Sequence, residues 1–192
     1  MALDYSLIDK FRRKVNSNHY FVMNQYKNQD GKNLWNIICS CMDWIEVAVN
    51  GIPHIQLEHK NSNVASLNLM QLICAMDLIK ESVHQLYRVF QLDYPFKSDH
   101  SIFKDKKTDD EHFKHLRAVF GVHPVNLKGE DNSRNFASWS TAKLDGDFSA
   151  FVYSNKIGVE DRLYSVWIND LFKYTNMRYL LLEEILKKID QD

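Results

Sequence analysis

Arg117 and His123 are the residues of this chain whose types and spacing are best suited to chemistry. They are separated by Ala-Val-Phe-Gly-Val within the segment FKHLRAVFGVHPVNL. A guanidinium stabilises the negative charge that develops on a phosphate, while an imidazole transfers protons near neutral pH. The pair therefore fits the cleavage of a phosphodiester bond. The spacing also fits a solvated or ion-paired arginine followed by a turn histidine that bonds to backbone, so this second interpretation stays open.

Gly121 decides whether these two side chains converge. In an unbroken α-helix, six positions turn the chain by about 600° and leave the side chains roughly 120° apart. A left-handed Gly121 at the helix end would reverse the chain and return His123 toward the turn that carries Arg117. We therefore predict that the helix ends at Gly121 in this conformation, with Pro124 stiffening the exit.

Histidines offer a second chemistry on the same predicted helix. His112 and His115 could present two metal nitrogens on one face, with a third ligand from Asp109 or from the loop that holds His54 and His59. Paired helical histidines are more often surface residues, so we predict that no metal is bound. A metal-dependent hydrolase remains the third alternative.

Motifs of several common enzyme classes are absent from the sequence. It contains no GxxxxGKS/T phosphate loop, GxGxxG, HExxH or GxSxG, which disfavours nucleotide hydrolases, dinucleotide oxidoreductases and α/β-hydrolases. Cys39, Cys41 and Cys74 lack CxxC spacing and are interpreted as reduced core or near-core residues. We therefore expect no cofactor.

Composition indicates a folded chain of one domain, spanning 1–192. Hydrophobic residues make up 45% and charged residues 26%, which is ordinary globular usage. The formal net charge of -1 means that RNA would have to meet a local basic patch. No run approaches the roughly 18 apolar residues that a membrane span needs, and the N-terminus lacks the apolar segment of a signal peptide. We expect a cytoplasmic protein without membrane contact.

The elements that must position these residues are mostly helices. Apolar periodicity predicts a mainly α fold, a helical bundle with a small antiparallel β-hairpin or meander before the C-terminal helix. Thr108 and Glu111 predict a capping box, Asp145-Gly146 a tight two-residue turn, and residues 93–107 a mobile charged loop. The predicted helices are 4–17, 19–26, 33–50, 63–92, 109–121, and from Asn169 or Asp170 to the end; the strands are 136–144, 147–154 and 163–168, in a subdomain at about 134–168.

FKHLRAVFGVHPVNL resembles the R-x(4–6)-H segment of HEPN-domain proteins, and WNIICSCMDWIEVAVNGI is similar to a helix in bacterial members of that group. The resemblance implies a helical bundle that dimerises and brings two copies of the motif together in a cleft. Many HEPN proteins are metal-independent ribonucleases of toxin–antitoxin, phage-defence or CRISPR-linked systems, while others are non-catalytic. The chain departs from the common pattern at Ala118, where the family often has a polar residue.

The resemblance assigns roles to residues of this chain. His123 would deprotonate a ribose 2′-hydroxyl or protonate the leaving oxygen, and Arg117 would stabilise the phosphorane-like transition state. Lys114, His115 and Asn126 would contact the substrate. The partners implied are RNA, a second copy of the chain, and an antitoxin or other protein. The alternative function is a non-enzymatic, dimeric helical interaction module.

Overall fold

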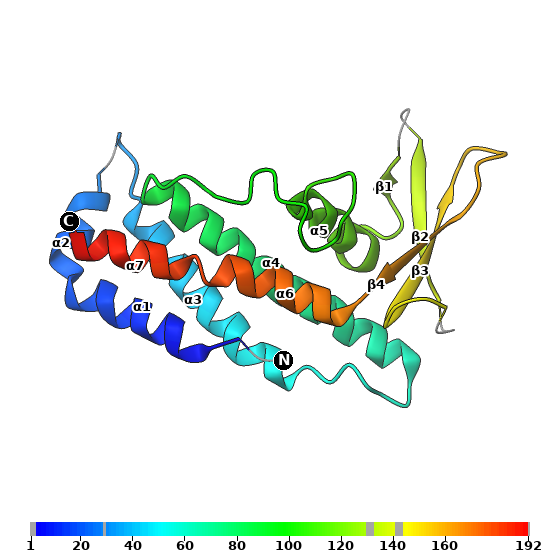
Figure 1. Cartoon of the computed structure of the whole chain (residues 1–192), viewed down its shortest axis with the longest axis horizontal. Helices are drawn as coiled ribbons and strands as arrows, with labels where there is room; N and C mark the ends of the chain where they lie inside the picture. Colours follow the sequence, from blue (N-terminus) through cyan, green and yellow to red (C-terminus); the bar gives the residue numbers. More distant parts are fainter. Residues whose placement is uncertain (1–2, 29, 130–132, 141–143, 192) are drawn as a thin grey trace. The chain divides into compact units, whose positions relative to one another are not determined.

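The structure is a computed structural model that describes residues 3–28, 30–129, 133–140 and 144–191. It is mainly helical, with one four-stranded antiparallel sheet that precedes the last two helices in the chain (Figure 1). This confirms the predicted class of a mainly α chain with a small sheet. The chain divides into two compact units, Met1–His54 with Ala75–Pro95 and Tyr174–Asp192, and Ile55–Cys74 with Phe96–Lys173. The long helix α4 (Ser62–Val89) and α6 (Ile168–Tyr179) contribute residues to both units.

The regular elements of the first unit are all helices in the part of the chain that the structure describes. It holds α1 (Tyr5–Ser17), α2 (His19–Tyr26), α3 (Trp35–Gly51), a 3-10 turn η1 (Ile52–His54) and α7 (Leu182–Gln191). The apolar positions of α1 recur every three or four residues, so one face is buried while the charged face is solvated. Its buried residues are Leu7, Ile8, Phe11 and Val15. This face packs against α3 and α7, and Figure 1 shows α7 running beside α1.

The second unit holds the sheet and the helix that carries Arg117. That helix is α5 (Asp109–Arg117), and it continues into a π-helical turn, η2 (Ala118–Val122). The strands are β1 (Leu127–Lys128), β2 (Arg134–Ser140), β3 (Phe148–Ser154) and β4 (Arg162–Val166), paired antiparallel in chain order. Trp139 of β2 packs its ring edge-on against Phe120 of η2 and Phe148 of β3. Aromatic contacts thus join the sheet to the end of the α5–η2 segment.

Most predicted elements are present with small shifts of their ends. The predicted helices 4–17, 19–26, 33–50 and 63–92 correspond to α1, α2, α3 and α4, and the predicted strand 163–168 to β4. The two-residue turn at Asp145-Gly146 is wrong, because Ser140 pairs with Ser149 and the connection is therefore longer. Residues 141–143, predicted as the end of a strand, lie outside the described residues. Gly146 does take a positive φ of 72°, and an added Cβ would lie 2.9 Å from the carbonyl oxygen of Val166.

The predicted final helix is two helices, α6 and α7, with a break at Leu180 and Leu181. Tyr179, Leu181 and Leu182 are all buried, and such close positions do not share one face of a straight helix. The amide of Leu181 bonds back to the carbonyl of Arg178, and the amide of Glu183 to that of Leu180. This tighter turn changes the phase of the apolar face.

One described helix, α4, is long and apolar enough by length and composition to cross a membrane. The core helix of a soluble protein passes the same test, so this indication is weak. Many of the apolar residues of α4 are fully buried within the protein. These include Leu69, Ile73, Met76, Ile79, Val83 and Leu86.

Candidate functional site

The start of α5 is fixed by the predicted capping box. Thr108 Oγ1 accepts a hydrogen bond from the Glu111 amide at 3.3 Å, and Glu111 Oε2 accepts one from the Thr108 amide at 3.0 Å. The amide and the hydroxyl of Thr108 both donate to the Glu111 carboxylate, and these two bonds lower its pKa. Acidic residues occupy the first turn and basic residues, including Arg117, the last, an order that complements the helix dipole. The position of Arg117 therefore follows from local sequence chemistry.

The end of this helix differs from the prediction at Gly121. The positive-φ glycines among the described residues are Gly31, Gly146 and Gly158, so the left-handed Gly121 is wrong. The chain forms a π-helical turn instead, closed by a hydrogen bond of 3.2 Å from the His123 amide to the Ala118 carbonyl oxygen. The three consecutive residues at 119–121 are buried. A π-helical turn is wider than an α-helical turn, so it can place all three on the buried side of the helix. π-Turns are rare and occur frequently at functional sites.

This π-turn lies between the two residues of the predicted pair. Arg117, just before it, is half-buried, and His123, just after it, is exposed. The backbone of His123 bonds to Ala118 and Asn126, and no hydrogen bond or ion pair of its imidazole is found among the described residues. The pair is thus separated by a helical turn, and no chain reversal at Gly121 returns His123 to Arg117. The catalytic roles of both residues stay a prediction.

The predicted substrate contacts lie on the same segment and differ in their surroundings. Lys114 is exposed on α5, and Asn126 is exposed after η2. The side-chain oxygen of Asn126 accepts a hydrogen bond of 2.9 Å from Arg134 Nη1. This contact brings an additional guanidinium of the sheet next to the predicted site.

His115 is the most perturbed histidine of the segment. Its Nε2 is buried and has no hydrogen-bond partner within the described part of the chain, and its ring lies 4.9 Å from that of Tyr164. Burial, followed by the positive charges of Lys107, His112 and Arg162, lowers its pKa to about 4. His115 is therefore neutral at pH 7.

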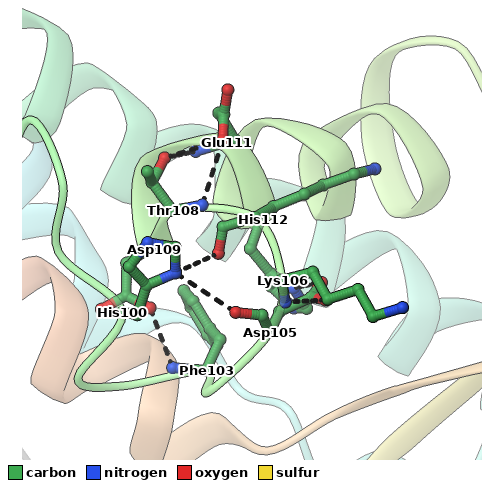
Figure 2. A network of polar contacts seen from close by, with 9 residues as sticks. His100, Phe103, Asp105, Lys106, Thr108, Asp109, Glu111 and His112 are labelled. Atoms are coloured by element: carbon green, nitrogen blue, oxygen red, sulfur yellow. Dashed lines mark hydrogen bonds and ion pairs between the residues drawn. The ribbon is translucent and has the colours of Figure 1, made fainter.

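A histidine–aspartate pair on the loop side of α5 was not predicted from the sequence. His112 Nδ1 lies 2.7 Å from Asp105 Oδ2, and this hydrogen bond lowers the pKa of Asp105 (Figure 2). The Phe103 ring stacks on the imidazole at 4.4 Å between centroids. A carboxylate that binds Nδ1–H leaves Nε2 free to accept a proton, the arrangement of a general base. Only the folded loop shows this pairing, since spacing alone paired His112 with His115.

The carboxylate of Asp109 is engaged in the same network. It is buried and accepts hydrogen bonds from the amides of Ile102 and Phe103, at 2.9 and 3.0 Å. Figure 2 shows the bond from the Phe103 amide, which ties the loop to the start of α5. Across the described residues, no group of three or more His, Cys, Asp and Glu side chains could hold a metal ion. The geometry therefore does not support the metal-dependent alternative that used Asp109 as third ligand.

Comparisons of this chain with models of protein families, with curated proteins and with solved structures find no match.

Proposed function

We propose that this protein is a metal-independent endoribonuclease of the HEPN type that acts in a cytoplasmic defence or stress system. The observation that supports it best is the π-turn between Arg117 and His123, which leaves an exposed imidazole just beyond a half-buried guanidinium. A rare helical geometry at that one place agrees with the function that the sequence motif predicts. Lys114 on α5 and Arg134 on β2, which binds Asn126, add positive charge to the site, as RNA binding requires.

The proposed reaction uses the ribose of the RNA as its own nucleophile. His123 takes the proton of the 2′-hydroxyl, and the 2′-oxygen attacks the adjacent phosphorus. Arg117 stabilises the extra negative charge of the phosphorane-like transition state. The bond to the 5′-oxygen then breaks, and a protonated imidazole gives that oxygen its proton. The products are a cyclic phosphate and a 5′-hydroxyl.

A homodimer accounts for both proton transfers. A single His123 cannot be base and acid in one step, whereas two copies of the chain supply two imidazoles. We therefore propose that the two motifs face each other in a dimer, as the resemblance implies. An antitoxin or other protein would control such an enzyme by covering this surface.

The test is incubation of total RNA with purified protein in EDTA. We expect the wild type to produce fragments with cyclic phosphate ends, and His123→Ala and Arg117→Ala to lower the rate about a hundredfold or more. His54→Ala, which changes an exposed histidine of the other unit, serves as the matched control. Cleavage by the wild type and His123→Ala alike, or by neither, would rule out this function.

A second candidate function is a non-enzymatic, dimeric interaction module. It is favoured by the exposed apolar side chains of α3, where Trp44 is 48% and Val47 57% exposed. Side chains of this kind at adjacent turns of one helix are typical of a surface that contacts another protein. This function predicts a dimer and no cleavage of RNA.

A further inference from the structure

A cleft of about 400 Å³ lies between the loop before α5 and the start of α6, entirely within the second unit. Phe103 and Trp167 line it, and Trp167 is 47% exposed. The carbonyl oxygen of Trp167 accepts hydrogen bonds from the amides of Asp170 and Leu171, which fix its backbone at the first turn of α6. A large aromatic side chain is thus held at a fixed point yet left open to solvent. Nucleic-acid bases stack on aromatic side chains exposed in this way.

Two lysines line the same cleft. Lys104 and Lys173 are exposed, and the one acidic residue of the lining, Asp170, lies 3.5 Å from Lys173 Nζ. The cleft therefore carries a net positive charge beside its aromatic wall. This combination suits a ligand that has both a planar ring and a phosphate.

The loop before α5, which forms one wall of the cleft, exposes its lysine side chains to solvent. Lys104, Lys106 and Lys107 are exposed, whereas Asp105 is bound to His112. Asp109 is buried against the amides of the loop. The acidic side chains are engaged by the protein itself, so the lysines dominate the charge that an approaching ligand meets.

Hydrogen bonds hold this wall in one arrangement. The Asp109 amide donates to the Asp99 carbonyl oxygen at 2.7 Å and closes the loop at its base. The stack of Phe103 on His112 fixes the aromatic ring from its rear face. Lys104 takes a left-handed backbone with φ of 52°, which is uncommon for a lysine and is found at functional sites. A preorganised wall loses little conformational entropy when a ligand binds.

We infer that this cleft binds single-stranded RNA, with a base stacked on Trp167 and the neighbouring phosphates bound by Lys104 and Lys173. The inference rests on the proposed ribonuclease function and names the subsite that holds the strand. A cleft of this volume admits an unpaired base, whereas the bases of a duplex are stacked inside the helix and cannot reach Trp167. The nearby pair of Asp105 and His112 supports the wall of the subsite through Phe103.

The experiment measures fluorescence anisotropy of a labelled oligouridine of about twelve nucleotides. All proteins carry His123→Ala, so the RNA stays intact during the titration. We expect Trp167→Ala to weaken binding between about fivefold and a hundredfold, and Lys104→Ala to lower the slope of log affinity against log salt by about 0.7. Phe21→Ala, an aromatic of the other unit that is 45% exposed, and Lys10→Ala, an exposed lysine of α1, should leave affinity and salt slope unchanged.

Failure of this inference differs from failure of the proposed function. No binding of oligouridine, equal loss in Trp167→Ala and Phe21→Ala, or equal competition by duplex RNA would overturn the cleft as a single-strand site. Specific binding that depends on Trp167, together with a wild type that does not cleave RNA, would keep the cleft and reject the nuclease. Circular dichroism of Trp167→Ala confirms that the variant is folded, and Trp167→Phe should restore most of the binding because it restores a stacking ring.

Discussion

His112 and His115 show how one short helix gives two imidazoles different chemistry. His112 points to the loop, where Asp105 holds its Nδ1 and Phe103 covers one ring face. His115 lies one turn further on, is half-buried beside Tyr164, and has a pKa of about 4. The first has its Nδ1 bound to a carboxylate, and the second stays uncharged at neutral pH. Sequence spacing put both on one helix but could not distinguish their surroundings, because Tyr164 comes from a distant strand and the preceding loop folds back on His112 in a way that no periodic pattern indicates.

Replacement of His115 by glutamine should change how stability depends on pH. The imidazole has a pKa of about 4 in the folded protein against the ordinary histidine value of 6.5, so the unfolded chain binds a proton more readily. The wild type should therefore lose stability as the pH falls from about 6.5 to about 4, by on the order of 1 to 2 kcal/mol for this partly screened ring. His115→Gln lacks this contribution. Urea unfolding at several pH values measures the difference between the two proteins.

The readout is the change of that difference with pH, so a general destabilisation by glutamine does not obscure it. His54→Gln, at an exposed histidine, should follow the wild type throughout. If the wild type and His115→Gln keep a constant difference between pH 7 and pH 4, the imidazole is not buried as the structure describes.

Local sequence chemistry predicted the helices and strands better than it predicted the connections between them. The capping box at Thr108 and the end of the helix predicted at 33–50 depend on neighbouring residues, and these predictions are close to the observed ends. The π-turn after Arg117 and the break at Leu180 arise because closely spaced residues must be buried, Val119 to Gly121 in the first case and Tyr179, Leu181 and Leu182 in the second. That requirement is tertiary and overrides the local preference of a glycine such as Gly121. Strand β1 is a two-residue pairing with β2, too short to leave a periodic pattern.

The Asp109 carboxylate connects the charged loop to the start of α5, and its removal should destabilise the protein. Asp109→Ala should remove two hydrogen bonds to a charged acceptor and leave the amides of Ile102 and Phe103 without their partner. We expect a loss of about 3 kcal/mol in the free energy of unfolding, with faster hydrogen exchange at those two amides. Urea denaturation and exchange measured by NMR check the two effects.

Thr108→Ala separates the loop contact from the start of the helix itself. It removes one side of the capping box and should cost about 1 kcal/mol, while the amides of Ile102 and Phe103 stay protected by Asp109. Thr108→Ser, which keeps the hydroxyl, should recover most of the loss. Equal protection of the two loop amides in Asp109→Ala and in the wild type would show that the carboxylate does not hold the loop.

The exposed face of α3 and the charges beside it affect whether two copies of the whole molecule can form a dimer. Trp44 and Val47 are about half exposed, and the adjacent Asp43 and Glu46 both bind Arg12 of α1 at 2.7 Å. The guanidinium bound to these carboxylates also has a raised pKa, mainly through its hydrogen bond to Asp43. The ion pairs with Arg12 offset the negative charges of Asp43 and Glu46. Two copies of this face would therefore repel each other less than two faces with unpaired carboxylates. In a two-fold dimer the same patch contacts itself, which suits a surface that is apolar and nearly neutral.

Substitution of this face should therefore change the oligomeric state. We expect the wild type to have twice the mass of one chain in light scattering after size exclusion, and Trp44→Glu with Val47→Glu to shift it to a monomer, because four added carboxylates would meet across the two-fold axis. Tyr20→Glu with Phe21→Glu, which adds the same charge to exposed positions of α2, should leave the dimer intact. A monomeric wild type at all concentrations would remove the dimer, and with it the supply of a second imidazole to the proposed reaction. A dimer that survives the α3 substitutions would place the interface elsewhere. The paired-motif mechanism is then tested by mixing wild-type chains with an excess of His123→Ala chains, where loss of cleavage in the mixed dimer requires that each copy supplies an imidazole to a shared site.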